Sequence, residues 1–223
     1  MVRRELTIAD LIESAKNFCA MEGRVFREEL FGVTDGKAVG TFVERLFKSY
    51  LSERFELTIG NSAKGLDLPS INTDIKVTSI RQPQSSSPYK DSRQKIYGLG
   101  YNLLVFVYER ETDILQKKGR LNFLSCTFIE AKRTADHKIT TGLLNIIRNK
   151  GSVEDISAFL SEQGIPGDEV TMARMAEEVL THPPVVGYLT ISNALQWRLK
   201  YRRIVTMDED IEGITPIVRY EGK

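Results

Sequence analysis

The strongest regularity in the chain is a helical repeat of apolar residues between positions 38 and 52. These residues recur at intervals of three and four positions, which places them in one stripe along a helix. They are Val39, Phe42, Val43, Leu46, Phe47, Tyr50 and Leu51. A second helical repeat follows Thr7, a typical N-cap residue with Asp10 three positions later. We therefore predict two amphipathic helices within the first 52 residues.

Alternating or continuous apolar runs predict the strands. They cover residues 73–78, 101–108, 121–131, 185–191 and 215–220. Helical spacing predicts further helices at residues 140–149, 153–163, 168–180 and 193–203. The order of these elements predicts an α/β fold with a mixed central sheet flanked by helices. We expect a single domain over residues 1–223 with a small helical insert, or subdomain, at about 140–184.

Composition excludes several classes of protein. The chain has 223 residues, of which 41% are hydrophobic and 27% charged, as expected for a globular protein. Its longest apolar stretch, around Leu103–Tyr108, is too short to cross a bilayer, and we see no signal peptide. With two cysteines and two histidines, a disulfide scaffold or a zinc finger is excluded. We expect a reduced, cytoplasmic protein without a membrane partner.

Net charge does not decide whether the protein binds nucleic acid, because the sum is only +1. The basic residues are nevertheless clustered, and clustering matters more than the sum. The glycines Gly32, Gly36 and Gly40 do not form a phosphate-binding GxxxxGK[ST] loop. We therefore expect no dependence on a nucleoside triphosphate.

Candidate chemistry is concentrated between Gly65 and Thr78. Asp67 lies in a predicted turn, and Asp74 and Lys76 follow in a predicted strand. Residues two positions apart share one face of a strand, so Asp74 and Lys76 face the same way and Ile75 points into the core. Two carboxylates and one ammonium group can thus converge at the edge of a sheet.

This trio suits the hydrolysis of a phosphodiester bond. Carboxylate oxygens hold Mg²⁺, which polarises a phosphoryl oxygen and lowers the pKa of a bound water molecule. The lysine stabilises negative charge in the transition state or orients the attacking water. Alternatively, Asp74 and Lys76 form the solvent face of an amphipathic strand, and Asp67 only shapes the turn.

The residues around this trio resemble a known family. Gly65–Ser87, which contains Asp74-Ile75-Lys76, and Arg93–Leu104 resemble bacterial type II restriction endonucleases of the PD-(D/E)xK superfamily. They also look like the related nicking endonuclease of methyl-directed mismatch repair. The resemblance covers about residues 36–108. Two departures are that Leu66, not proline, precedes Asp67, and that the second acid is an aspartate where the family often has glutamate.

The resemblance implies a restriction-endonuclease-like core, a requirement for Mg²⁺, and a bacterial or archaeal restriction-modification system. It also implies a further metal-binding acid on a preceding helix. The matching position is Glu44, on the flank of the apolar stripe, with Glu53 as the second choice. Glu44 can equally be an ordinary surface residue. The implied catalytic and metal-binding residues are thus Glu44, Asp67 and Asp74, with Lys76 as the catalytic cation.

A similar pattern occurs later in the chain. Glu130-Ala131-Lys132 also has an acid and a lysine two positions apart, and Asp113 lies upstream of it. Asp113 belongs to a polar, hairpin-like run, residues 109–120, and lacks the glycine turn that precedes Asp67. We expect Lys132 to contact phosphate or solvent instead of forming the active site.

Two segments carry side chains suited to reading DNA. Amides pair with adenine edges and arginines with guanine edges, whereas lysine suits phosphate. One segment directly follows the catalytic strand, and the other is the predicted helix that carries Trp197. The proposed DNA-binding residues are Arg81, Gln82, Gln84, Lys90, Arg93, Gln196, Arg198 and Arg202. The alternative for both segments is a solvated polar surface.

Three functions are compatible with the sequence. The first is a type II restriction endonuclease that cleaves double-stranded DNA at a specific short sequence, as a homodimer acting on a palindrome. The second is a monomeric strand-nicking DNA repair endonuclease with the same chemistry. The third is a non-catalytic helix-turn-helix protein using residues 152–180, although four acids on its second helix would repel phosphate. We predict the first.

Overall fold

The computed structural model describes residues 3–57, 65–87, 91–192 and 197–222. The chain divides into two compact units. The first unit comprises residues 1–85, 102–129 and 205–223, and the second comprises residues 86–101 and 130–204. In the described part of the chain, no helix is long and apolar enough to span a membrane.

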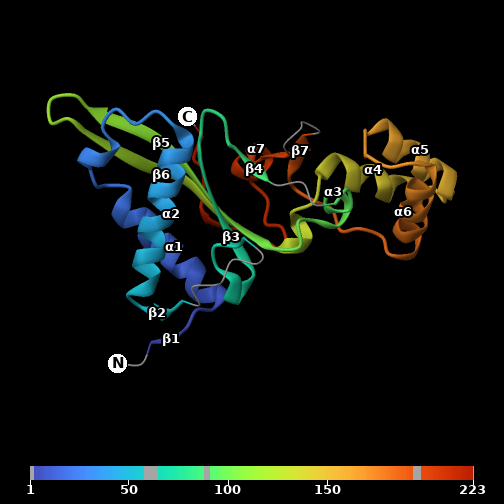
Figure 1. Cartoon of the computed structure of the whole chain (residues 1–223), viewed down its shortest axis with the longest axis horizontal. Helices are drawn as coiled ribbons and strands as arrows, with labels where there is room; N and C mark the ends of the chain where they lie inside the picture. The colour runs from blue at the N-terminus through green and yellow to red at the C-terminus, as the bar shows by residue number, and fades with distance from the viewer. Residues whose placement is uncertain (1–2, 58–64, 88–90, 193–196, 223) are drawn as a thin grey trace. The chain divides into compact units, whose positions relative to one another are not determined.

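A four-stranded mixed sheet forms the centre of the first unit (Figure 1). In the order in which they lie side by side, its strands are β3 (Thr73–Ser79), β5 (Asn102–Asp113), β6 (Lys118–Ile129) and β9 (Ile214–Val218). β3 pairs with β5 in parallel, whereas β6 is antiparallel to both of its neighbours. Because β3 has only one neighbour in this sheet, its free edge is open to other segments.

Two long helices pack against the sheet, α1 (Ile8–Glu22) and α2 (Gly36–Ser52). Thr7 caps α1 and forms the predicted capping box with Asp10. The smaller elements are β1 (Arg4–Glu5), η1 (Glu28–Leu30), β2 (Phe55–Glu56) and η2 (Pro69–Ile71). β1 and β2 form a separate parallel pair. The mixed sheet flanked by helices confirms the predicted α/β fold, as expected for a restriction-endonuclease-like core.

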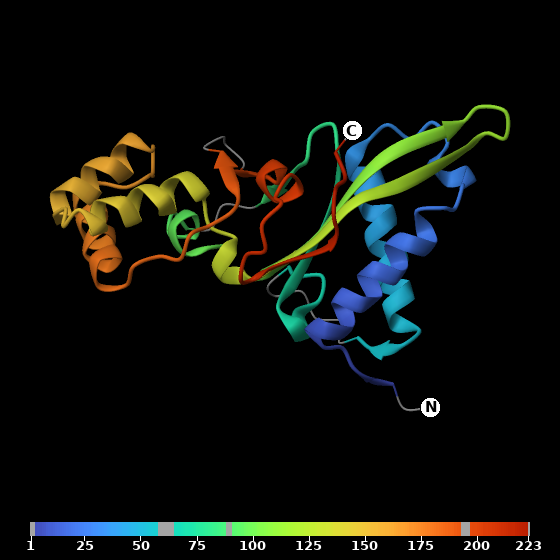
Figure 2. The same cartoon turned by 180° about the vertical axis from the view of Figure 1, so that it is seen from behind.

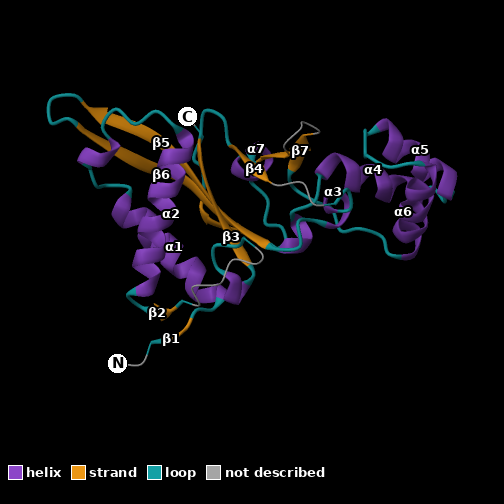
Figure 3. Ribbon diagram, in the orientation of Figure 1, coloured by secondary structure: helices purple, strands orange, loops and turns teal. Residues whose placement is uncertain are grey.

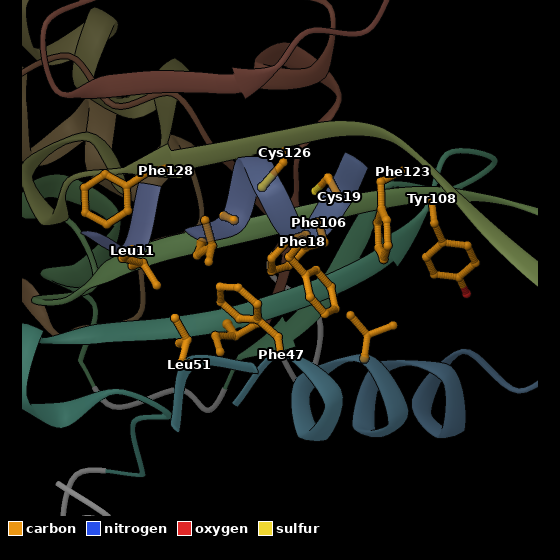
Figure 4. Close-up of a cluster of buried hydrophobic side chains, with 14 of the residues drawn as sticks. Leu11, Phe18, Cys19, Phe47, Leu51, Phe106, Tyr108, Phe123, Cys126 and Phe128 are labelled. Carbon is orange, nitrogen blue, oxygen red and sulfur yellow. The ribbon is translucent and has the colours of Figure 1, made fainter. Parts of the chain in front are cut away.

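Aromatic residues hold α1 and α2 against the sheet (Figure 4). Phe47 lies 5.0 Å from Phe18 of α1 and 5.1 Å from Phe106 of β5, both in edge-to-face geometry between ring centroids. Such pairs contribute about 0.5–1.5 kcal/mol each beyond the burial of their area. Val43 and Leu51 are also buried, so the predicted apolar stripe of residues 38–52 is confirmed. This packing fixes which flank of α2 lies beside β3.

The second unit contains a small helical cluster (Figure 3). Its main helices are α4 (His137–Arg148), α5 (Val153–Glu162) and α6 (Glu169–Thr181). They share an apolar core that includes Leu143, Ile156 and Met175. The remaining elements are β4 (Gln84–Ser87), α3 (Gln94–Tyr97), η3 (Ala131–Arg133), β7 (Thr190–Ser192), β8 (Trp197–Lys200) and α7 (Arg202–Val205). β4, β8 and β7 form a three-stranded sheet, and β4 begins at the end of the first unit.

The helices α4 to α6 occupy the segment predicted to form a helical insert. The compact unit around them is wider than 140–184, since it includes residues 86–101 and extends to 204. Whether the chain behaves as one domain with an insert stays a prediction.

The helix predicted at residues 193–203 is wrong where the structure describes it, and residues 193–196 lie outside the described residues. Residues 197–200 form the strand β8, in which Trp197 and Leu199 are buried while Arg198 and Lys200 are exposed. This alternation has the period of two that is typical of a strand. Arg202 begins the four-residue helix α7 instead of lying on one long helix with Arg198. The strand predicted at 185–191 is reduced to Thr190–Ser192.

Candidate active site

A tight turn brings Asp67 beside the strand that carries the other candidate residues. The turn contains η2, with Pro69 at its start and Asn72 in the left-handed conformation at its end (φ 49°). Leu68 and Thr73 then exchange two backbone hydrogen bonds of 2.9 and 3.1 Å. Asparagine tolerates this backbone conformation better than most residues. The local sequence therefore folds the chain back so that Asp67 lies next to β3.

Asp67 is fixed at both of its carboxylate oxygens. One oxygen, Oδ2, accepts a hydrogen bond of 2.9 Å from the backbone N–H of Ile75. The other, Oδ1, accepts a hydrogen bond from the Lys48 ammonium group on α2. Asp67 thus connects the helix to the edge strand.

Asp74 and Lys76 project from the same face of β3, as the period of two predicts. The Lys76 Nζ lies 2.7 Å from the Asp74 Oδ2. Ile75, between them, is completely buried in the core on the opposite face. A protonated Asp74 carboxyl group can donate a hydrogen bond to the Asp67 carboxylate. The predicted convergence of these three side chains at the edge of the sheet is therefore present.

Glu44 reaches the same place from α2, and it is half-buried. Its pKa is raised by burial and by the negative charge of Asp67 and Asp74, while Lys48 and Lys76 act in the opposite direction. Four charged groups therefore influence Glu44: Lys48 on the same helix, and Asp67, Asp74 and Lys76 from the turn and β3. The position that the family resemblance selected lies in the cluster.

Burial is the largest single influence on the pKa of both aspartates. Burial is the largest cause that raises the pKa of Asp74 to about 6, and Asp67 adds to it against the influence of Lys76. Burial also opposes ionisation of Asp67. The hydrogen bonds from Asp74, Lys48 and the Ile75 N–H outweigh this effect, so the pKa of Asp67 is lowered. The site therefore concentrates more negative charge than its lysines compensate.

Lys48 is the site residue that the sequence analysis missed. It lies four residues after Glu44, so both side chains project from one face of α2. A lysine on the flank of an amphipathic helix is usually an ordinary surface residue, and the sequence pattern gave no reason to select it. Its spacing of four residues from Glu44 becomes informative only once Glu44 is placed in the site.

The donor set fits a hard divalent cation. Glu44, Asp67 and Asp74 offer carboxylate oxygens, which Mg²⁺ prefers to nitrogen or sulfur. The raised pKa values of Glu44 and Asp74 mark negative charge that a cation would neutralise. Among the described residues, no group of three or more histidine, cysteine, aspartate and glutamate side chains has the arrangement of a preformed metal site. Here the lysines contact the aspartate oxygens.

Three of the residues proposed to contact DNA, Arg81, Gln82 and Gln84, follow the end of β3. Arg81 is exposed and lines an open cavity of about 470 Å³ together with Arg110 and the first residues of α2. Gln82 is exposed, and Gln84 is half-buried. The hydroxyl of Thr78 donates to the backbone carbonyls of both glutamines. The turn that presents these side chains is thereby held rigidly against β3.

The other proposed DNA-binding residues belong to the second unit. Arg93 is exposed, but its Nε donates a hydrogen bond of 2.7 Å to Glu178. Arg198 and Arg202 are exposed on β8 and α7. Lys90 and Gln196 lie outside the described residues.

The alternative pattern of Asp113, Glu130 and Lys132 does not converge. Asp113 pairs with Lys118 at the turn between β5 and β6, whereas Glu130 follows the last residue of β6. The strand between them spans about 36 Å at about 3.3 Å per residue. Glu130 and Lys132 form a surface ion pair of 3.2 Å. These three residues cannot form one active site within this fold.

Comparisons with known proteins were consistent with each other. A family model described as type II restriction enzyme NspV matches residues 5–216. A curated relative, "Type II restriction enzyme NspV" from Nostoc sp., is 48% identical over 214 residues, covering 96% of this chain and 97% of the relative. No solved structure gave a significant match.

Proposed function

The chain belongs to the NspV family of type II restriction enzymes, which are site-specific deoxyribonucleases, and we propose that Glu44, Asp67, Asp74 and Lys76 form its active site. The observation that carries this proposal is their convergence. The turn and β3 bring Asp67, Asp74 and Lys76 together at the free edge of β3, and Glu44 on α2 is close enough for their charges to shift its pKa. Their types and order fit the PD-(D/E)xK pattern, to which we assign the enzyme.

Each residue of the cluster has a distinct role in this proposal. Glu44, Asp67 and Asp74 would hold Mg²⁺, which when bound polarises a phosphoryl oxygen and lowers the pKa of a water molecule. Lys76 supplies a positive charge beside the scissile phosphate, where negative charge increases in the transition state. The backbone N–H of Ile75 keeps Asp67 oriented before substrate arrives.

We propose that the substrate is double-stranded DNA containing a specific short sequence and that the enzyme acts as a homodimer. A two-fold symmetric dimer places one active site on each strand of a palindrome. A nicking monomer would instead release nicked circles as the end product. The time course of supercoiled, nicked and linear plasmid distinguishes these cases, and the sequence at the cut ends then gives the recognition site.

Neutralising either aspartate tests the active site. We expect Asp67→Asn and Asp74→Asn each to abolish cleavage with Mg²⁺, because each removes a carboxylate that the metal needs. The loss should be about a thousandfold or more in rate, or about 4 kcal/mol. Far-UV circular dichroism should show an intact fold. Asp113→Asn is the matched control and should cleave normally. Near wild-type rates for both site variants at saturating Mg²⁺ would show that the assignment is wrong.

The DNA-binding residues should divide into two groups. We propose that Gln82, Gln84, Gln196 and Arg198 include base-reading residues, and that Lys90, Arg93 and Arg202 mainly bind phosphates. An amide or guanidinium paired with a base edge contributes about 1–3 kcal/mol of discrimination. A phosphate contact instead carries no sequence information and adds about one unit to the salt slope.

Binding to cognate and scrambled duplexes across a salt series, in Ca²⁺, separates the two groups. Truncating a base-reading residue should weaken cognate binding far more than scrambled binding. Truncating a phosphate-binding residue should weaken both equally and lower the salt slope by about one unit. Equal losses for every variant would mean that these segments do not read the sequence.

A further inference from the structure

Lys48 is a second fixed cation in the carboxylate cluster. Its ammonium group contacts Oδ1 of Asp67, whereas Lys76 contacts Oδ2 of Asp74. Each lysine therefore serves a different aspartate. Lys48 also lies one helical turn from Glu44 on α2. No comparison assigns this lysine a role.

The contact with Lys48 leaves Asp67 able to bind a metal. Each carboxylate oxygen has two lone pairs. Asp67 uses one pair of Oδ1 for Lys48 and one pair of Oδ2 for the Ile75 N–H. When Asp74 is ionised and donates no hydrogen bond to Asp67, one lone pair on each oxygen remains for a metal ion. Lys48 and a metal ion can thus bind the same carboxylate simultaneously, with Lys48 limiting its rotation.

The formal charge of the cluster limits how many divalent ions it can hold. Three carboxylates, those of Glu44, Asp67 and Asp74, and the ammonium groups of Lys48 and Lys76 give a formal charge of −1. One divalent ion changes this to +1, and the phosphate of the substrate then restores neutrality. A second divalent ion would leave an uncompensated charge of +2 in a half-buried place, even with the phosphate bound, and would be repelled by Lys48 directly.

We propose that Lys48 takes the place of a second metal ion, so that each active site binds one divalent cation. In this role Lys48 is a positioning residue, because it acts through Asp67 and through the charge of the site. The inference rests on the proposed function, since it takes Glu44, Asp67 and Asp74 as the metal ligands. It gives a role to a lysine that contacts the same carboxylate as the proposed cation.

Titration with Mn²⁺ alone tests this inference without DNA or cleavage. Free Mn²⁺ is measured by electron paramagnetic resonance, and bound ions are counted per protomer. We expect one bound Mn²⁺ for the wild type. Lys48→Met removes the charge at nearly constant length, so it should tighten the first ion by about tenfold and allow a second to bind. Lys48→Arg keeps the charge and should again bind one ion.

Two further variants test whether changes in Mn²⁺ binding come from Lys48 and from the proposed metal ligands. Lys37→Met removes an exposed lysine from the same helix, α2, and should leave the affinity for Mn²⁺ within about twofold of the wild type. Asp74→Asn should lose the bound ion. If Asp74→Asn binds Mn²⁺ as the wild type does, the proposed metal ligands are wrong and the proposed function fails with them.

The role of Lys48 can fail separately. Two ions of comparable affinity in the wild type would overturn it, while loss of binding in Asp74→Asn still supported the site. An unchanged number and affinity of ions in Lys48→Met would overturn it as well. Should Lys48→Met unfold, Lys48→Gln provides the same loss of charge with a polar side chain.

Discussion

The edge strand β3 and the hairpin of β5 and β6 carry nearly the same charged residues in different arrangements. Before and within β3, a turn of a few residues places Asp67 beside Asp74 and Lys76. In the hairpin, whose two long strands Figure 2 shows from behind, the whole of β6 lies between Asp113 and Glu130. Side chains of the same types thus form a cluster only where a short turn, and not a full strand, separates them along the chain.

Burial separates the two regions as clearly as distance does. The side chains of Asp74 and Lys76 are 9% and 20% exposed, whereas those of Glu130 and Lys132 are 46% and 42% exposed. Water screens the second pair, so its attraction is weak. Near β3 the carboxylates interact strongly enough to change each other's pKa. Catalytic groups that act at neutral pH commonly have pKa values shifted by their surroundings, as near β3.

The largest expected difference between the two regions is in cleavage. Lys76→Ala should eliminate it, because Lys76 acts on charge that appears in the transition state. Lys132→Ala should change only DNA affinity or its salt dependence. Plasmid cleavage at saturating Mg²⁺ measures both variants under the same conditions. An inactive Lys132→Ala together with an active Lys76→Ala would reverse the assignment of the active site.

The second expected difference is in the free energy of unfolding when no metal is bound. The folded pKa of Asp74 is about 6, above its ordinary value of 3.8. This carboxyl group therefore stabilises the fold fully below pH 3.8, and the contribution is lost as pH rises through 6. Asp74→Asn stays neutral, so in EDTA it should be more stable than the wild type at pH 7, by on the order of 2 kcal/mol.

The gain from Asp74→Asn should shrink between pH 6 and pH 4, where the wild-type carboxyl becomes protonated. Urea unfolding at several pH values measures it. Asp113→Asn is the control, because Asp113 is half-buried at the end of the hairpin and accepts a turn hydrogen bond from the Gln116 N–H. A pH-independent difference for Asp74→Asn would mean that repulsion and burial at the site are not its cause.

The periodicity of the sequence correctly predicted the elements in which the spacing of nearby residues determines which face is buried. The repeat on α2 is such a case, because its apolar stripe forms one buried face. In β3 the alternation correctly placed Ile75 in the core, opposite Asp74 and Lys76. The alternation of Trp197 and Leu199 was present too, but it is only four residues long and was assigned to a helix. Short elements take their conformation from their neighbours in space, which a single sequence does not reveal.

The same limit explains what was predicted of the site. Asp67, Asp74 and Lys76 lie within ten residues, so a turn and a strand sufficed to bring them together. Glu44 required the resemblance to a family, because it is distant in the chain. Lys48 is defined by its contact with Asp67, nineteen residues away, and that contact depends on how α2 packs beside β3.

The smallest expected effect concerns the ion pairs themselves. In double-mutant cycles in EDTA, with each pair replaced by neutral residues of similar size, the coupling energy of Glu130 and Lys132 should be about 0.2–1 kcal/mol. It should fall further in high salt, because water and ions reach both groups. The coupling of Asp74 and Lys76 should be larger and less sensitive to salt, since both side chains are largely buried. Equal couplings with equal salt dependence would show that burial does not distinguish the two regions. Their difference in cleavage would then have to come from the neighbouring groups, Glu44, Lys48 and Asp67.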